Sequence, residues 1–432
     1  MPATATQVAL SVVELTRAGR FDEVRDLFAP PLRPMVTSEA LAAAWSAAID
    51  RLGPVTSVGT PVGESSPGVV LVKVPLAFER GGLTAIVAVT SAGQLSGVQL
   101  APAEAMQPAA AWEPPAYADP STFAEEEVTL GSAPLAVPGT LSLPRRAEPL
   151  TAVVLLAGSG PMDRDETIGP NKPFRDLAWG LASRGVAVLR FDKVTHVHPE
   201  ECRANAAFTL TDEYVPQALA ALGLLRGHPA IDPSRVFIAG HSLGGTVAPR
   251  VAATEPAVAG LAILAGGAQP LQWAIVRQIR YLSSLEAGTT AGPASALETL
   301  TRQAERVDGP DLSASTPAAD LPLGTPAPYW LDLRAYDAPA AAARLAKPML
   351  VLQGARDYQA TVDDDLARWQ AALAGRPDVT IRVVSSANHF FFVGSGSSTP
   401  QESLSPQHVD PAVVDTLADW LRSTPVVTSP GR

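Results

Sequence analysis

Hydrophobic positions in the N-terminal part of the chain follow a helical spacing first and an alternating spacing afterwards. Three helices are predicted, over residues 4–18, 21–27 and 38–52. Four strands are predicted after them, over residues 55–60, 68–78, 83–90 and 95–101. Asp22 and Ser38 are the expected N-caps of the second and third helices. Helices followed by an antiparallel sheet indicate a small α+β domain over residues 1–101.

The pattern changes twice beyond that domain. Prolines recur through residues 102–122, which predicts a linker, because proline interrupts regular structure. After a predicted hairpin, buried strands are expected over residues 152–157, 186–191, 236–238, 261–265, 348–353 and 380–384. Helices are expected between and after them, over residues 174–184, 211–226, 246–253 and 409–422. This alternation predicts an α/β domain over residues 123–425, with a doubly wound and mostly parallel sheet.

One interval is too long to be a single crossover between strands. Residues 268–346 contain helical spacings and a Pro-, Ser- and Gly-rich stretch, so we expect a helical cap over the site. Tyr329 and Trp330 lie in this interval. They have two interpretations, which the sequence leaves open: they bind substrate in an acyl pocket, or they pack the cap on the core.

A Gly-x-Ser-x-Gly motif at residues 240–244, called here the serine turn, lies between a buried strand and a small-residue helix. Glycines at its ends allow a strand to turn sharply into a helix and to present the serine hydroxyl above the sheet. The motif alone is weakly specific, but its strand–turn–helix setting favours Ser242 as a nucleophile. His241 within the turn is interpreted as a packing or substrate-binding residue.

A serine nucleophile needs a general base, and the base needs an orienting carboxylate. In proteins with a serine turn of this kind, the acid and then the histidine come later in the chain, each after a later strand of the sheet. Asp357 follows the predicted strand at 348–353, and His389 follows the one at 380–384. We therefore expect Asp357 as the acid and His389 as the base.

Other acids and histidines fit these roles less well. The rival acids Asp363, Asp364 and Asp365 lie where a helix is expected to begin, and they suit its N-terminal dipole. The rival histidines, none of which follows a late strand, are His196, His198, His228 and His408.

The oxyanion of an acyl-transfer reaction needs two backbone donors. The amide of Leu243, directly after the nucleophile, is the first expected donor. The second is expected from the glycine loop, residues 158–161, which follows the buried strand at 152–157. We favour the amide of Ser159, with Gly158 allowing the substrate to approach closely.

Composition narrows the functional classes. The net charge is -11 with no basic cluster, which argues against nucleic acid as a partner. Cys202 is the only cysteine, so no internal disulfide and no cysteine-based metal site is expected. No apolar run reaches the roughly 18 residues of a membrane helix, and no signal peptide is visible, so a cytoplasmic location is expected. No phosphate, flavin, nicotinamide or metal motif is present, and no cofactor is expected.

Residues 123–425 resemble the α/β-hydrolase superfamily, in particular bacterial serine carboxylesterases and related serine aminopeptidases and thioesterases. The resemblance rests on the glycine loop with its following Met-Asp-Arg-Asp, the serine turn, residues 354–357 and Asn388-His389. It implies the triad of Ser242, Asp357 and His389. It also implies that Asp163, Arg164 and Asp165 support the glycine loop through ion pairs. Two positions depart from the relatives, Ala157 in place of His and Val194 in place of Arg, and they leave the substrate open.

The N-terminal domain resembles the cone-shaped domain of the nuclear transport factor two type, through its order of elements, the phrase at residues 18–21 and Trp45. Such a domain could shape a substrate entrance, form a homodimer contact or simply stabilise the chain.

Together these features predict a serine hydrolase that cleaves a short- or medium-chain carboxylic ester through an acyl-enzyme. Thioester or amide hydrolysis is the nearest alternative, because it uses the same triad. An acyltransferase or cyclising enzyme of secondary metabolism is another. A non-enzymatic alternative makes the N-terminal domain a binder of a small apolar ligand.

Overall fold

The protein divides into two compact units, seen in a computed structural model that describes residues 4–30, 32–33, 36–66, 69–103, 111–147, 149–285 and 292–425. The first unit comprises Met1–Ala109 and Ile275–Ala327. The second comprises Ala110–Ala274 and Pro328–Arg432. The boundary thus falls inside the interval predicted as a cap, and the role of that interval as a cap stays a prediction.

The first unit contains helices followed by an antiparallel sheet, as the sequence predicts. Its N-terminal helices are α1 (Ala5–Arg17), α2 (Phe21–Asp26) and α3 (Ser38–Leu52). Its strands are β1 (Val55–Val58), β2 (Val62–Ser66), β3 (Val69–Phe78), β4 (Gly81–Thr90) and β5 (Leu95–Pro102). The strand order is β1-β3-β4-β5, and β2 also pairs with β3. Apolar side chains from the helices and from one face of the sheet form its core.

Two caps and one strand of this unit differ from the predictions. Thr37, not Ser38, caps α3, with its hydroxyl accepting a hydrogen bond from the amide of Ala40 at 3.1 Å. The Ser38 hydroxyl instead donates to Asp22, so Asp22 joins two helices and does not cap α2. Strand β2 was not predicted, because its sequence Val-Gly-Glu-Ser-Ser has no apolar alternation.

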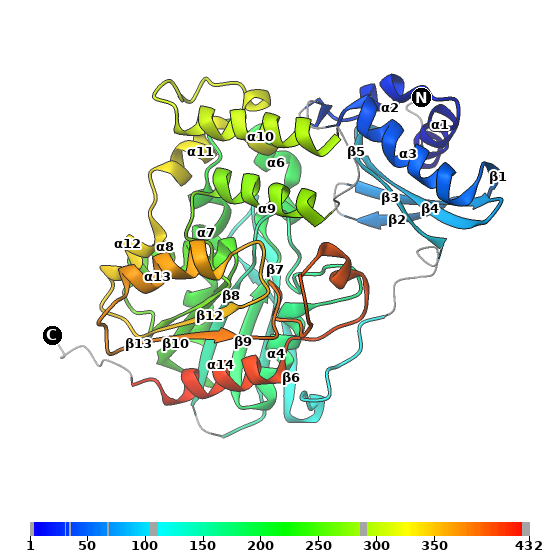
Figure 1. Cartoon of the computed structure of the whole chain (residues 1–432). Helices are drawn as coiled ribbons and strands as arrows, with labels where there is room; N and C mark the ends of the chain where they lie inside the picture. The colour runs from blue at the N-terminus through cyan, green and yellow to red at the C-terminus, as the bar shows by residue number, and fades with distance from the viewer. Residues whose placement is uncertain are drawn as a thin grey trace. The chain divides into compact units, whose positions relative to one another are not determined.

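The second unit is built on an eight-stranded sheet in the order β13-β12-β11-β10-β8-β9-β7-β6 (Figure 1). Its strands are β6 (Phe123–Leu130), β7 (Val137–Pro144), β8 (Leu150–Leu156), β9 (Val186–Phe191), β10 (Ile231–His241), β11 (Leu261–Leu264), β12 (Met349–Gly354) and β13 (Val379–Val384). The strands β8 to β13 pair in parallel with one another. The hairpin of β6 and β7 is antiparallel, and β7 pairs antiparallel with β9. The prediction of an α/β fold with a mostly parallel sheet is confirmed.

Helices cover both faces of this sheet. One face carries α7 (Leu210–Gly227), α8 (Leu243–Thr254), α12 (Ala338–Ala343) and α13 (Ala367–Ala372). The other face carries α4 (Pro173–Ser183) and α14 (Pro411–Ser423). Two short helices after β9, α5 (Val194–Val197) and α6 (Pro199–Ala204), were not predicted.

The long interval between β11 and β12 is helical, as its spacing predicts. It contains α9 (Leu271–Leu285), α10 (Gly292–Asp308) and α11 (Ala327–Arg334) before α12. Helix α11 was missed, because Pro326 and Pro328 read as breakers. Pro328 lies at the start of the helix, where a missing amide proton costs little.

The end of the expected linker is attached to the second unit. The indole Nε1 of Trp112 donates to the buried carboxylate of Asp176 in α4 at 2.8 Å. The guanidinium of Arg175 lies 4.4 Å from the centre of the Trp112 ring. Residues 104–110 of the linker lie outside the described part of the chain.

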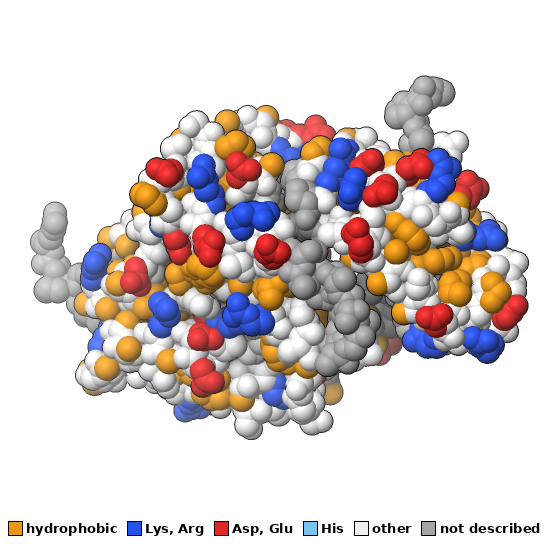
Figure 2. Space-filling view, turned by 45° about the horizontal axis from the view of Figure 1, so that its top comes forward, with side chains coloured by type: hydrophobic (Ala, Val, Ile, Leu, Met, Phe, Trp, Pro, Cys, Tyr) orange, Lys and Arg blue, Asp and Glu red, His pale blue; other side chains and the backbone are white. Residues whose placement is uncertain are grey.

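Charged side chains of both signs are interspersed on the face shown in Figure 2, without a field of one sign. In the described ranges, none of the helices has both the length and the hydropathy needed to cross a bilayer.

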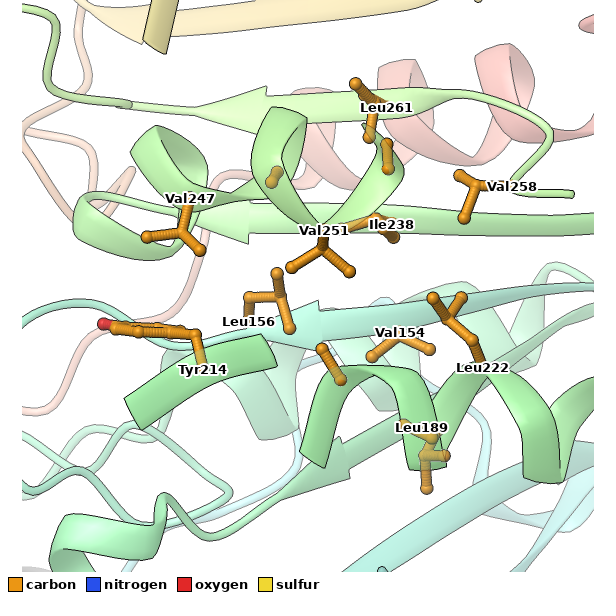
Figure 3. Close-up of a cluster of buried hydrophobic side chains, with 14 of the residues drawn as sticks. Val154, Leu156, Leu189, Tyr214, Leu222, Ile238, Val247, Val251, Val258 and Leu261 are labelled. Carbon is orange, nitrogen blue, oxygen red and sulfur yellow. The ribbon is translucent and has the colours of Figure 1, made fainter. Parts of the chain in front are cut away.

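On one face of the sheet, the core behind the serine turn is formed by β8 together with the helices α7 and α8 (Figure 3). Val154 and Leu156 of β8 pack with Tyr214 of α7 and Val251 of α8. The alternate residues Val153 and Leu155 belong to the core on the opposite face. A strand that is apolar on both sides is the expected pattern for a sheet covered on both faces.

Candidate active site

Ser242 lies between β10 and α8 in a conformation that a residue with a side chain rarely adopts. Its φ is 52° and its ψ is -122°. Its amide donates to the carbonyl of Leu264 at 2.9 Å, and its carbonyl accepts from the amide of Thr246 at 3.0 Å. Such strain persists only where surrounding contacts hold it, and it is concentrated at functional sites.

The glycines of the serine turn are required by space. A Cβ atom on Gly240 would lie 2.2 Å from the carbonyl oxygen of Gly244. A Cβ atom on Gly244 would lie 2.1 Å from the carbonyl oxygen of Leu156. Neither glycine has a positive φ, so the turn is tight because strand β8 and helix α8 approach it closely.

The structure brings His389 and Asp357 together. The His389 Nδ1 lies 2.7 Å from the Asp357 Oδ2, and both side chains are buried. The other oxygen of Asp357 accepts the amides of Gln359 and Ala360, and Gln353 Nε2 donates to Oδ2 at 2.9 Å. Both oxygens of Asp357 thus accept hydrogen bonds, and the His389 Nδ1 is placed to donate its proton to Oδ2.

His389 is also placed beside the serine turn. Its ring centre lies 4.7 Å from that of His241, and its carbonyl oxygen lies at hydrogen-bond distance, 2.9 Å, from the His241 Nε2. The loop that carries His389 is fixed by buried Asn388, whose Oδ1 accepts the amides of Phe390 and Phe392 at 3.1 and 3.0 Å.

The glycine loop lies against the serine turn. A Cβ atom on Gly158 would come within 3.2 Å of the Ser242 Cβ. The Gly158 amide donates to Glu166 Oε1 at 2.6 Å, and the Gly158 carbonyl accepts from Lys193 and Tyr214. Because the Gly158 amide is engaged, it is not the loop's donor to a substrate oxygen.

His241, predicted as a packing or substrate-binding residue, is buried and has both ring nitrogens bonded. Its Nδ1 lies 2.9 Å from Glu166 Oε1 and its Nε2 faces the carbonyl of His389. Burial disfavours the His241 imidazolium, but the Glu166 carboxylate outweighs burial and raises the pKa of His241. These contacts favour packing and leave no free ring nitrogen for a substrate.

Tyr329 and Trp330 pack in the second unit as parts of α11. The Tyr329 hydroxyl donates to Glu213 Oε2 at 2.5 Å, and Trp330 is 1% exposed. Burial and then Glu213 raise the pKa of the Tyr329 hydroxyl well above its usual value. Of the two interpretations left open by the sequence, these contacts favour packing.

The acidic and basic residues after the glycine loop form ion pairs. Arg164 contacts Asp192 at 3.1 Å, and Asp165 contacts Arg190 at 2.9 Å. Asp163 differs, because it accepts hydrogen bonds from the amide and hydroxyl of Thr167. Burial disfavours the charged form of Asp165, but Arg190 and Lys172 together outweigh it and lower the pKa of this carboxyl.

The rival residues have other partners. Asp365 accepts the amides of Ala268 and Gln269, and Asp364 is bonded to Thr361. The four rival histidines contact Pro161, Ala136, Ala230 and Asp176, respectively. Over the described residues, no three His, Cys, Asp or Glu side chains are grouped in a way that would hold a metal ion.

Three buried ionisable residues at the site were not predicted: Glu166, Lys193 and Glu213. Each lies within a helix or loop whose sequence gives no motif for it. The signal in the sequence for Lys193 is its position between the predicted strand at 186–191 and Val194.

The chain is similar to several esterases. The chain is 36% identical over 346 residues to the esterase EstD of Thermotoga maritima, covering 80% of this chain and 78% of that protein. Among solved structures it is similar to Est1E from Butyrivibrio proteoclasticus, with 14% identity, a TM-score of 0.45 and coverage of 69% and 98%. It is also similar to an esterase of Pyrococcus furiosus, with 14% identity, a TM-score of 0.44 and coverage of 74% and 99%.

The family model described as "Alpha/beta hydrolase family" matches residues 153–403, which include the glycine loop, the serine turn, Asp357 and His389. The chain therefore belongs to the alpha/beta hydrolase family, and it is a hydrolase.

Proposed function

We propose that the protein is a serine esterase that works through an acyl-enzyme, with Ser242, His389 and Asp357 as its triad. The observation that carries this proposal is the strained serine between β10 and α8, with a buried His–Asp pair beside the same turn. Such strain and such a pair are both expected when a serine hydroxyl must be presented and activated.

In this mechanism Ser242 attacks the ester carbonyl while His389 Nε2 takes the hydroxyl proton and then delivers it to the leaving alcohol. Asp357 holds the Nδ1 proton and stabilises the imidazolium. The amides of Leu243 and Ser159 stabilise the oxyanion. Water, activated by the same histidine, then releases the acid and restores the serine.

The proposed substrate is a small carboxylic ester with a short or medium acyl chain. The similarity to an esterase of Thermotoga maritima supports an ester over a thioester or an amide.

We also propose a cytoplasmic location for the protein. For its N-terminal domain we propose the fold of the nuclear transport factor two type, which the order of helices and antiparallel strands supports.

A Ser242→Ala variant tests this function on para-nitrophenyl esters of graded chain length. Loss of the nucleophile should lower kcat by about 10⁴-fold or more, because removing one member of a triad is nearly as damaging as removing all. Ser57→Ala, an exposed serine of β1, is the matched control and should keep the activity of the unmodified protein.

Turnover by Ser242→Ala within about tenfold of the unmodified protein would contradict the proposal. Release of para-nitrophenol only when an alcohol or amine acceptor is added, with the acyl group recovered as the ester or amide of that acceptor, would instead indicate an acyltransferase.

A further inference from the structure

The peptide bond between Gly158 and Ser159 is held at its carbonyl oxygen by two buried side chains. The Lys193 Nζ donates to the Gly158 carbonyl at 2.9 Å, and the Tyr214 hydroxyl lies 2.8 Å from the same oxygen. The amide of this same peptide bond belongs to Ser159, the proposed oxyanion donor of the glycine loop.

Lys193 has three acceptors around its amino group. Besides the Gly158 carbonyl, it contacts the Tyr214 oxygen at 2.8 Å and Glu213 Oε1 at 2.8 Å. Three acceptors use all three protons of an ammonium group, whereas a neutral amine has only two to give. The arrangement therefore fits the charged form, although burial lowers the pKa of Lys193 against the opposing effect of Glu213.

A trans peptide bond is planar, and its C=O and N–H point in opposite directions. Fixing the Gly158 oxygen therefore fixes the direction of the Ser159 N–H. A cation on the carbonyl oxygen also draws electron density from the amide and makes its proton a stronger donor, as in cooperative hydrogen-bond chains.

We propose that Lys193 is a positioning residue that orients and polarises the Ser159 amide through the Gly158 carbonyl. This inference rests on the proposed function, in which the Ser159 amide holds the oxyanion. Glu213 and Tyr214 serve it indirectly, since Glu213 pairs with the ammonium and Tyr214 binds the same carbonyl. The preceding peptide bond is fixed from its other side, because the Gly158 amide donates to Glu166 at 2.6 Å.

Packing alone does not explain a lysine here. Lys193 is 2% exposed and lies among α7 residues, where an apolar side chain of similar length would fill the same space. Replacing a buried ion pair by apolar residues is often neutral or stabilising. Loss of activity without loss of stability is therefore the distinguishing sign of a positioning role.

The test compares Lys193→Met, Glu213→Gln and the double variant Lys193→Met/Glu213→Gln. The double variant removes the ammonium without leaving Glu213 as an uncompensated buried charge. We expect its kcat to fall about 10²-fold, as for loss of one oxyanion donor, with KM changed by less than about threefold. Glu213→Gln, which keeps the lysine, should lose less than about tenfold.

A second readout separates oxyanion stabilisation from general damage. A trifluoromethyl ketone forms a tetrahedral adduct with the serine, so its affinity should fall by the same factor as kcat/KM. An alcohol with the same carbon chain as the product acid is neutral and carries no oxyanion. Its affinity for the variant should stay within about threefold of its affinity for the unmodified protein.

Tyr214→Phe keeps the ion pair and removes the hydroxyl, whose one proton is shared between the carbonyl oxygens of Gly158 at 2.8 Å and Ala157 at 3.0 Å. This variant therefore tests the inference even if lysine variants fail to fold. It should bind the trifluoromethyl ketone about tenfold more weakly. Unchanged ketone affinity in this variant would overturn the proposal.

Recovery of wild-type kcat in the double variant would also overturn it, because the loss in Lys193→Met would then come from the unpaired Glu213. These failures differ from failure of the esterase proposal itself, which shows as turnover by Ser242→Ala.

Discussion

Ser242 occupies a backbone conformation that costs about 1–3 kcal/mol for a residue with a side chain. The conformation persists because β8, β10 and α8 pack closely at the turn. Two glycines make this meeting possible, and each faces a backbone carbonyl oxygen where its Cβ would otherwise lie.

Gly244→Ala should therefore destabilise the protein by about 3 kcal/mol and remove its esterase activity, because the new methyl group would collide with the carbonyl of Leu156. Gly223→Ala is the matched control, since no atom lies within 4 Å of a Cβ built there. Being inside α7, it should stabilise the fold by roughly 0.5–1 kcal/mol. Urea unfolding of both variants measures these changes, and equal effects would contradict the steric explanation.

At the scale of elements, α4 joins two segments that are distant from it in the chain. Its buried Asp176 accepts hydrogen bonds from Trp112 of the linker and from the amide of Val409 before α14, and it lies 3.1 Å from His408. The hydrogen bond from His408 to Asp176 raises the pKa of His408, with burial opposing it. This junction therefore adds a pH-dependent contribution to stability.

The direction of this pH dependence follows from the raised pKa of His408. The folded state binds the His408 proton more tightly than the unfolded state, so the contribution is complete below about pH 6.5 and is lost as pH rises through the folded pKa. Replacing the ring, as in His408→Gln, should cost more free energy of unfolding at about pH 5.5 than at about pH 9. The effect should be modest, because the His408 side chain is 36% exposed. Denaturant unfolding at both values measures it, and a difference that does not vary with pH would refute the assignment.

For the whole molecule, the sequence pattern predicted what local rules determine. Apolar periodicity along the chain predicts the strands β8 to β13 and the serine turn. It also predicts the strand ends that precede Asp357 and His389. Helix α11 escaped prediction because proline at a helix start looks the same in sequence as a breaker.

The supporting contacts could not be predicted for a different reason. Glu166 and His241 are 75 residues apart, and Lys193 and Gly158 are 35 apart, so their pairing exists only once the sheet is folded. The assignment of Ile275–Ala327 to the first unit could not be predicted either, because this segment groups with the N-terminal residues although it lies between β11 and β12.

The central claim, that Ser242 is the nucleophile of an ester hydrolase, is tested most directly by peptide mass spectrometry after treatment with a small fluorophosphonate. We expect one adduct, on Ser242, accumulating in step with the loss of para-nitrophenyl ester hydrolysis, because an activated serine reacts far faster than any other hydroxyl. An adduct on a different residue, or full hydrolysis by protein that is completely modified at Ser242, would contradict the claim.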